Sequence, residues 1–211
     1  MVRNALQSAI RILPAWPIYV IGFGPAAWWT YLAVTNQLGA EPAIALEHKL
    51  GLFALQLLIV SLMITPIRDW FSVNFIKYRR AVGLMAFYYV LLHLAAYLLL
   101  DHQVHWIGWD AVIKDVTKRP YIFIGVAALV VLVPLALTSN NLAIRKMGPL
   151  RWRVLHQLSY VAILAGAAHF VLLKKTWQIE PIVYCCIASV LVAYRFRGAL
   201  NSLKFAQIQP K

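Results

Sequence analysis

Two histidines in uncharged apolar stretches are the residues best placed to do chemistry. His93 lies 13 residues after Arg80, which begins one such stretch. His169 lies 16 residues after Arg153, which begins another. At 1.5 Å per residue, the two imidazoles sit about 20–24 Å along their helices, at a similar depth. Neutral imidazoles on two helices at one depth can bind a haem iron from opposite sides, so the pair predicts haem ligation.

The residues next to these histidines are small, which favours the close approach of a flat cofactor. Ala95 and Ala96 follow His93, and the run AGAA at 165–168 precedes His169. The alternative is that each histidine only hydrogen-bonds to Ser, Tyr or a backbone carbonyl of another helix. A haem iron or a hydrogen-bonding group would each avoid the cost of an unpaired imidazole in hydrocarbon. One histidine alone favours this packing role, whereas a depth-matched pair favours haem.

A third histidine, His156, lies only 3 residues after Arg153, about 5 Å up the same helix. On an ideal helix its side chain points about 140° away from that of His169, 13 residues on. When the similar segment YRRAVGL is superposed, Gly83 falls opposite His156, so a histidine partner is missing. His156 could be a single axial ligand, an exchanging ligand of a shared haem, or part of a quinone or flavin site.

Two arginines, Arg79 and Arg80, are expected at about the membrane depth of His156 and suggest a second binding site there. They could bind the phosphate or headgroup of a cofactor near His156. The favoured interpretation is that they anchor the helix at a membrane surface.

The remaining histidines are weaker candidates. His48, in EHKLG, lies at the start of an expected helix and could contact an outer cofactor, but an interfacial histidine needs no special partner. His102 and His105 lie in a loop, where solvated histidines are ordinary. Asp101 and Asp110 are too few additional ligands for a metal site there.

The elements that carry these residues are predicted to be transmembrane helices. Of the 211 residues, 62% are hydrophobic and only 13% are charged, and a soluble domain carries about 25% charged residues. Uncharged runs long enough to span about 30 Å of hydrocarbon predict six helices in one domain, 1–211, with an all-α integral membrane fold. The expected helices are 14–34, 50–67, 81–100, 120–138, 154–173 and 181–196.

The net charge of +13 is explained by topology rather than by nucleic acid binding. If both termini are cytoplasmic, 14 of the 20 basic residues lie on the cytoplasmic side. Asp69 is then the single acidic residue there, and the other six lie outside. This follows the positive-inside rule and predicts a multi-pass protein in contact with membrane lipid. The outer loop 101–119 is long enough to dock a partner.

Several motifs together resemble one known family. The chain resembles MsrQ (YedZ), the haem-binding membrane subunits of bacterial MsrPQ methionine-sulfoxide reductase systems. These belong to the ferric-reductase-like transmembrane family, which includes the membrane part of NADPH oxidases. The stretches that carry the resemblance are EHKLG (47–51), LMITPIRDW (62–70), RRAVGL…LLHLAAY (79–97), KRPYIFIG (118–125), LALTSNN (135–141) and RWRVLHQLSYVAILAGAAHF (151–170).

The resemblance implies a six-helix b-type cytochrome in the bacterial inner membrane. Such a subunit passes electrons outward to MsrP, a periplasmic molybdopterin reductase that carries out the methionine-sulfoxide chemistry itself. The quinone pool is the implied donor, FMN is an implied additional cofactor, and His93, His156 and His169 match the haem-associated histidines. NADPH oxidases carry four such histidines, and this sequence lacks the inner one on its third helix, so one or two haems are expected.

We therefore expect an electron-transferring subunit of an oxidoreductase system, with no catalytic residue of its own. One alternative is a ferric or quinone reductase that acts without MsrP. The other is a non-redox scaffold or transporter in which histidines serve only packing. No acidic residue lies inside an expected helix, which disfavours a proton-coupled transporter.

Overall fold

The computed structural model describes residues 7–8, 10, 12–101, 108–174 and 176–208, with side chains as far as residue 197. This part of the chain holds helices and no strands. In chain order, the helices are α2 (Pro17–Gly22), α3 (Gly24–Val34), α4 (Pro42–Phe71), α5 (Ile76–Ala96), the π-helical turn η1 (Tyr97–Asp101), α7 (Trp109–Lys118), α8 (Pro120–Leu137), α9 (Asn141–Met147), α10 (Pro149–His156), α11 (Leu158–Leu173) and α12 (Ile179–Ile208). His102 and His105 lie outside the described residues.

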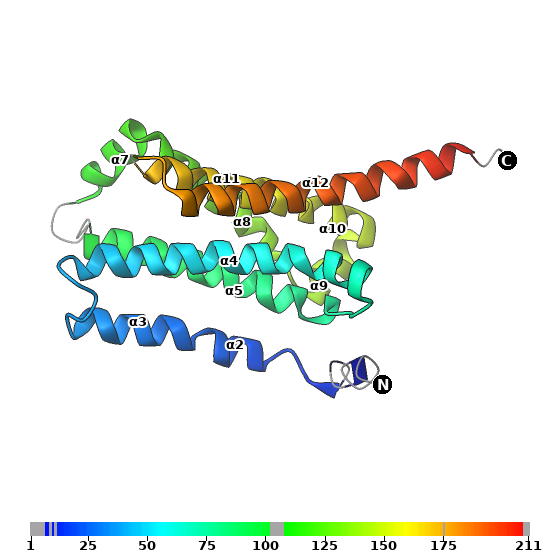
Figure 1. The fold of residues 1–211 in the computed structure, drawn as a ribbon, viewed down its shortest axis with the longest axis horizontal. Helices are drawn as coiled ribbons and strands as arrows, with labels where there is room; N and C mark the ends of the chain where they lie inside the picture. The colour runs from blue at the N-terminus through cyan, green and yellow to red at the C-terminus, as the bar shows by residue number, and fades with distance from the viewer. Residues whose placement is uncertain (1–6, 9, 11, 102–107, 175, 209–211) are drawn as a thin grey trace.

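Five helical segments of the described chain are long and apolar enough to cross a membrane. They are Pro42–Phe71, Ile76–Leu100, Pro120–Leu137, Pro149–Leu173 and Ile179–Arg197. They run side by side along the long axis of the molecule and alternate in direction (Figure 1). The protein is therefore a multi-pass membrane protein, and five of the six expected spans are present.

The first expected helix, 14–34, is not continuous, so the prediction of a sixth spanning helix is not confirmed. It is divided at Phe23 into α2 and α3, each too short to span a bilayer. The hydroxyl of Tyr89 occupies the break: it donates to the carbonyl of Gly22 at 2.6 Å and accepts from the amide of Ala26 at 3.1 Å. In an unbroken helix these two backbone groups would bond each other, so Tyr89 replaces one helical hydrogen bond with two.

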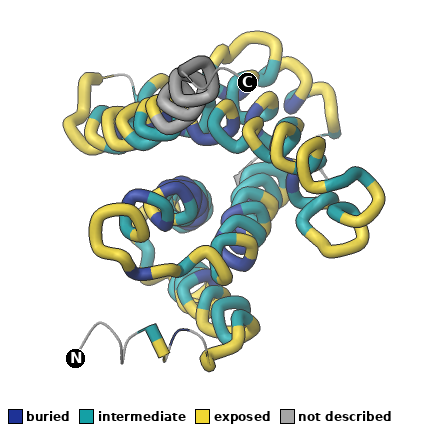
Figure 2. The backbone as a smooth tube through the Cα atoms, turned by 90° about the vertical axis from the view of Figure 1, so that its right-hand side faces the viewer, coloured by how far each residue is buried: buried dark blue, intermediate teal, exposed yellow. Residues whose placement is uncertain are grey.

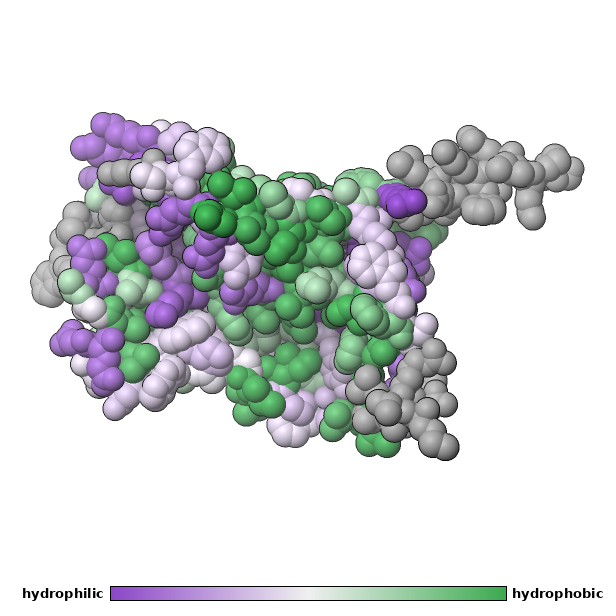
Figure 3. Space-filling view, in the orientation of Figure 1, coloured by the Kyte–Doolittle hydropathy of each residue, from purple (hydrophilic) through white to green (hydrophobic). Residues whose placement is uncertain are grey.

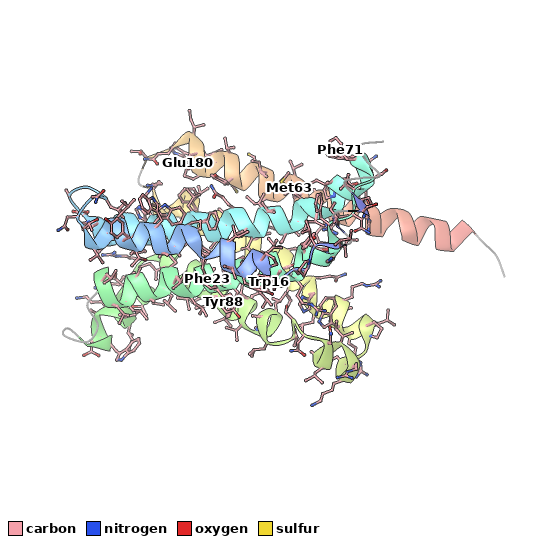
Figure 4. All side chains as sticks on the ribbon, turned by 90° about the horizontal axis from the view of Figure 1, so that it is seen from below. Trp16, Phe23, Met63, Phe71, Tyr88 and Glu180 are labelled. Atoms are coloured by element: carbon pink, nitrogen blue, oxygen red, sulfur yellow. The ribbon has the colours of Figure 1, made fainter. Side chains whose placement is uncertain are left out.

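The side chains around this break come from α5. The ring of Tyr89 is fully buried, and Phe23 lies with its ring centre 5.8 Å from that of Tyr88. Figure 4 labels Phe23 and Tyr88 beside each other at this contact. Helix α2 thus packs on α5 and helix α3 on α4, and the phenol of Tyr89 fixes the junction between α2 and α3.

Helix α4 is the most buried span. It is two turns longer at its start than the expected 50–67, because Pro42 begins it and the polar run Glu47, His48, Lys49 continues it. Pro66 has no amide hydrogen to offer the carbonyl of Leu62, and Arg195 of α12 donates to that carbonyl instead at 3.2 Å. A proline inside a spanning helix is tolerated here because another helix satisfies the freed backbone group.

The surface is apolar where the spans are exposed. Large side chains such as Val130, Val154 and Val190 lie on the outside of the bundle. Hydrophobic residues cover the middle of the face in Figure 3, and hydrophilic ones gather mainly at the end that carries α7. Buried positions concentrate on the helices in the interior of the bundle (Figure 2). This distribution is the one expected of a protein whose middle faces lipid.

The two ends of the bundle carry different connections. The α3–α4 turn, η1 and α7 lie at one end, which we call the outer end (Figure 1). The α4–α5 turn, α9 and α10 lie at the opposite, inner end (Figure 1). The expected outer loop 101–119 is helical over Trp109–Lys118.

Candidate functional site

His93 lies near the end of α5 and faces α4. Its Nδ1 is 2.9 Å from the backbone carbonyl oxygen of Glu47. A carbonyl can only accept a hydrogen bond, so the proton of the neutral ring must be on Nδ1. The other nitrogen, Nε2, then carries a lone pair that can bind a metal.

His169 repeats this arrangement on α11. Its Nδ1 is 2.6 Å from the backbone carbonyl oxygen of Tyr121, near the start of α8. The same reasoning places its proton on Nδ1 and leaves Nε2 as a lone-pair donor. Each histidine is thus oriented by a main-chain oxygen of the neighbouring helix, which is how proteins commonly fix metal-binding imidazoles.

The two rings lie next to each other, between α5 and α11. Their centres are 6.2 Å apart, and their planes are 78° from each other. A histidine nitrogen lies about 2 Å from a bound metal, with the ring centre about 1.2 Å behind it, so two axial imidazoles have centres about 6.3 Å apart. The separation and the donor atoms of this outer pair therefore fit one iron held between two neutral imidazoles.

Glycines on the neighbouring helices allow this contact, and reasoning from the sequence alone missed them. A Cβ at Gly51 of α4 would stand 2.9 Å from Nδ1 of His93. A Cβ at Gly125 of α8 would stand 2.9 Å from Nδ1 of His169. The available signal was that both glycines end stretches that carry the family resemblance, EHKLG and KRPYIFIG.

The surroundings of the outer pair are apolar. Leu46, Leu50 and Ala96 are buried on the His93 side, and Ala167 is buried on the His169 side. In the described part of the chain, no three His, Cys, Asp or Glu residues come together as a group that could hold a metal ion. Two nitrogen donors alone fit a cofactor iron, whose other ligands the cofactor supplies, better than a bare ion.

His156 lies at the inner end, away from the outer pair, and has a different environment. Its Nε2 is 3.1 Å from the hydroxyl oxygen of Thr138. That hydroxyl has one proton and also lies 2.6 Å from the carbonyl oxygen of Pro134, which can only accept it. Nε2 of His156 therefore carries the ring proton and donates to Thr138, and the free lone pair is on Nδ1.

The His156 ring is covered on one face by Trp152, whose ring centre is 3.9 Å away at 26°. The indole of Trp152 donates to the carbonyl of Thr138 at 2.9 Å. Gln157, between α10 and α11, keeps a right-handed helical backbone, so His156 and His169 lie on one helical span, Pro149–Leu173.

The predicted arginines join His156 at the inner end. Arg79 and Arg80 lie within electrostatic range of its imidazole. Arg80 also donates to the side-chain oxygen of Asn141 at 2.8 Å. The five predicted site residues thus divide into an outer pair, His93 and His169, and an inner group, which consists of His156, Arg79 and Arg80. His48 lies within α4, in electrostatic range of His93.

Comparison with known proteins gives the family. Residues 50–167 match the family model described as "Ferric reductase like transmembrane component". A protein of Brucella anthropi is 51% identical over 180 residues, 85% of this chain and 80% of the relative. It is named protein-methionine-sulfoxide reductase heme-binding subunit MsrQ. This chain belongs to the MsrQ family.

A second MsrQ protein, from Brucella ovis, is 48% identical over 196 residues, which are 93% of this chain and 87% of that protein. The resemblance drawn from the sequence motifs is therefore confirmed. The matched family region begins one residue before Gly51 and ends two residues before His169. It thus includes His93 and the whole inner group.

Proposed function

We propose that this protein is the haem-binding membrane subunit of a methionine-sulfoxide reductase system and that it carries electrons across the membrane. The observation that carries the proposal is the outer pair, in which two imidazoles 6.2 Å apart both present Nε2 lone pairs. Membership of a family whose relatives are named heme-binding subunits supports it.

In this proposal, His93 and His169 would hold the iron of a haem b through their Nε2 atoms. When bound, a haem supplies an iron that accepts and releases one electron at a time. The chain's part is to hold both imidazoles neutral and oriented. The carbonyls of Glu47 and Tyr121 do this, because each accepts the Nδ1 proton and so increases the electron-donating power of the opposite nitrogen.

The packing around the outer pair would keep water from the site. Leu46 and Leu50 lie one residue before Glu47 and Gly51 on α4 and are buried. A dry, apolar environment disfavours the charged, oxidised form of a haem over the neutral, reduced form. The packing would therefore help to set the reduction potential.

We assign the inner group to the side at which electrons enter. His156, Arg79 and Arg80 would contact the electron-donating cofactor or substrate, which is a quinol, an FMN or a second haem. The arginines suit the phosphate of a flavin or the carboxylates of a porphyrin. His156 would bind an iron through Nδ1, or through Nε2 after release of Thr138.

The acceptor on the outer side would be MsrP, a periplasmic molybdopterin reductase. Overall, oxidation of one quinol to a quinone would release two electrons and two protons. Two electrons and two protons reduce one sulfoxide to a thioether and water. The distribution of basic residues supports a bacterial inner membrane location with both termini cytoplasmic. Helix α7 would form part of the surface that meets MsrP.

A dithionite-reduced minus oxidised spectrum of the purified protein tests haem binding. We expect b-type bands in the wild type, and His93→Ala and His169→Ala should lose the bands of the haem at the outer pair. His156→Ala, at the other end of the bundle, should keep the low-spin bis-imidazole signal of the outer pair. A wild type without haem bands, or His93→Ala and His169→Ala variants with unchanged bands, would contradict the proposal.

The donor and acceptor need a separate test. Proteoliposomes that contain the protein and a reduced quinone should support methionine-sulfoxide reduction by added MsrP. Iron reduction in the same vesicles, with no electron delivery to MsrP, would indicate a stand-alone ferric reductase instead.

A further inference from the structure

The two halves of the outer pair are built to the same plan. In each half, a histidine donates from Nδ1 to a carbonyl four residues before a glycine on the neighbouring helix. Glu47 and Gly51 form this unit for His93, and Tyr121 and Gly125 form it for His169. The helix pairs are α4 with α5 and α8 with α11, which are the two most extensive helix contacts in the described chain.

Helix geometry explains why the residue four positions after the carbonyl must be small. A helical carbonyl points toward the C-terminal end of its helix, toward the residue four places on. Side chains point back toward the N-terminal end, so the Cβ of that later residue lies beside the carbonyl. A histidine can therefore reach the oxygen from the side only if no Cβ stands there.

The distances at both glycines agree with this reasoning. An added Cβ at Gly51 would approach Nδ1, Cε1 and Cγ of His93 to 2.9, 3.1 and 3.4 Å. At Gly125 the corresponding distances to His169 are 2.9, 3.0 and 3.5 Å. The atoms that would be approached belong to a rigid ring, held by its hydrogen bond, so the ring itself would have to move.

We propose that Gly51 and Gly125 are positioning residues that set the place of the His93 and His169 imidazoles and keep their Nδ1–carbonyl hydrogen bonds. The inference rests on the proposed haem ligation by these two histidines. A methyl group at either glycine would displace one ring from its carbonyl and from the line between the two rings. The affected histidine would then be a weaker and wrongly oriented ligand.

The test is the full-length purified protein with Gly51→Ala or Gly125→Ala. We expect haem to be lost to excess apomyoglobin at least about tenfold faster than from the wild type, the range typical of removing a partner of a metal-binding histidine. We also expect the low-spin bis-imidazole signal to be weakened and the midpoint potential to be shifted. Helix destabilisation cannot account for these changes, because replacing glycine by alanine inside a helix increases helix propensity.

Gly83, on the histidine-bearing helix α5, provides a matched control. A Cβ at Gly83 meets nothing within 4 Å. Gly83→Ala should therefore keep the wild-type spectrum, potential and haem-loss rate. If Gly51→Ala and Gly125→Ala behave like this control in a wild type that binds haem through His93 and His169, the inference is wrong and the proposed function stands.

A second substitution tests the inference if a glycine variant fails to fold. If Gly51→Ala does not accumulate, adding His93→Ala should restore accumulation to the level of His93→Ala alone, because the smaller side chain removes the contact. Accumulation that is not restored would overturn the inference. A wild type that contains no haem would instead overturn the proposed function.

Discussion

The outer pair and the inner group both contain histidine, but their imidazoles are prepared in opposite ways. At the outer pair, backbone carbonyls hold the proton on Nδ1 and leave Nε2 available. At the inner end, the hydroxyl of Thr138 accepts from Nε2 of His156 and leaves Nδ1 available. The position of the accepting oxygen, beside Nδ1 or beside Nε2, therefore decides which ring nitrogen keeps its lone pair.

Charge separates the two regions further. The outer pair is lined by buried apolar side chains, whereas the inner imidazole lies near Arg79 and Arg80 and under the ring of Trp152. Positive charge and a covering aromatic ring suit the recognition of an anionic or flat partner. The outer pair is thus suited to hold a resident metal cofactor, and the inner group to meet a second molecule.

Exchanging one ligand type should produce the largest separation between the regions. In His169→Met, a thioether replaces one imidazole, and methionine ligation raises the midpoint potential of a haem. We expect a rise on the order of 100 mV, within the about 0.8 V range that axial ligands control. A redox titration followed in the visible spectrum measures it.

The same substitution at the inner end is the control. His156→Met should leave the potential of the haem proposed at the outer pair unchanged within measurement error, because His156 is not part of that pair. Equal shifts in both variants would show that the two regions are one coupled site and would remove the distinction drawn above.

How much of this could be predicted from the sequence depends on whether a feature is local. The matched depth of His93 and His169 followed from counting residues, because a helix rises by a constant amount. The helix at 120–138 was predicted almost to the residue, because Pro120 begins it and its apolar run has clear limits. The start of α4 was missed because Glu47, His48 and Lys49 interrupt the apolar run without interrupting the helix.

Features that depend on the register between helices were not predictable. The carbonyls of Glu47 and Tyr121 carry no signal of their own in the sequence, since every residue has one. Their importance comes from the alignment of α4 with α5 and of α8 with α11. The division of the first helix was missed for the same reason: Pro25 weakens that helix locally, but Tyr89, more than sixty residues away, completes the break.

That break gives the next largest expected effect. Tyr89→Phe removes the hydroxyl that satisfies the carbonyl of Gly22 and the amide of Ala26, and both are left unpaired. We expect a loss of about 2–5 kcal/mol in stability, from two unsatisfied backbone groups. Thermal unfolding in detergent, followed by helical circular dichroism, measures the change.

Tyr88→Phe is the matched control, since Tyr88 is the adjacent residue on α5 and is exposed. It should cost much less stability than Tyr89→Phe. Although Tyr89 lies one turn before His93, the haem spectrum should persist in Tyr89→Phe wherever the protein is folded, because α4 rather than α2 or α3 orients His93. Loss of the spectrum from folded Tyr89→Phe would extend the outer site to the first two helices.

The smallest effect is expected at the inner end, where Thr138→Val removes the acceptor of the His156 proton. Hydrogen bonds between membrane helices contribute on average about 0.6 kcal/mol, so the loss of stability should be of that size. Thr30→Val is the control, because the hydroxyl of Thr30 makes the same local bond to a carbonyl four residues earlier, that of Ala26, at 2.8 Å, without a histidine.

The informative readout of Thr138→Val is the state of His156, which nitrogen-15 NMR of labelled histidine can follow. With its acceptor gone, the ring is no longer held with the proton on Nε2, and its resonance should move toward a mixture of the two neutral forms. The His93 and His169 resonances should not move, because main-chain carbonyls accept their Nδ1 protons and the substitution leaves those carbonyls in place. A shift of all three would mean that the fixed outer pair and the adjustable inner histidine do not respond independently.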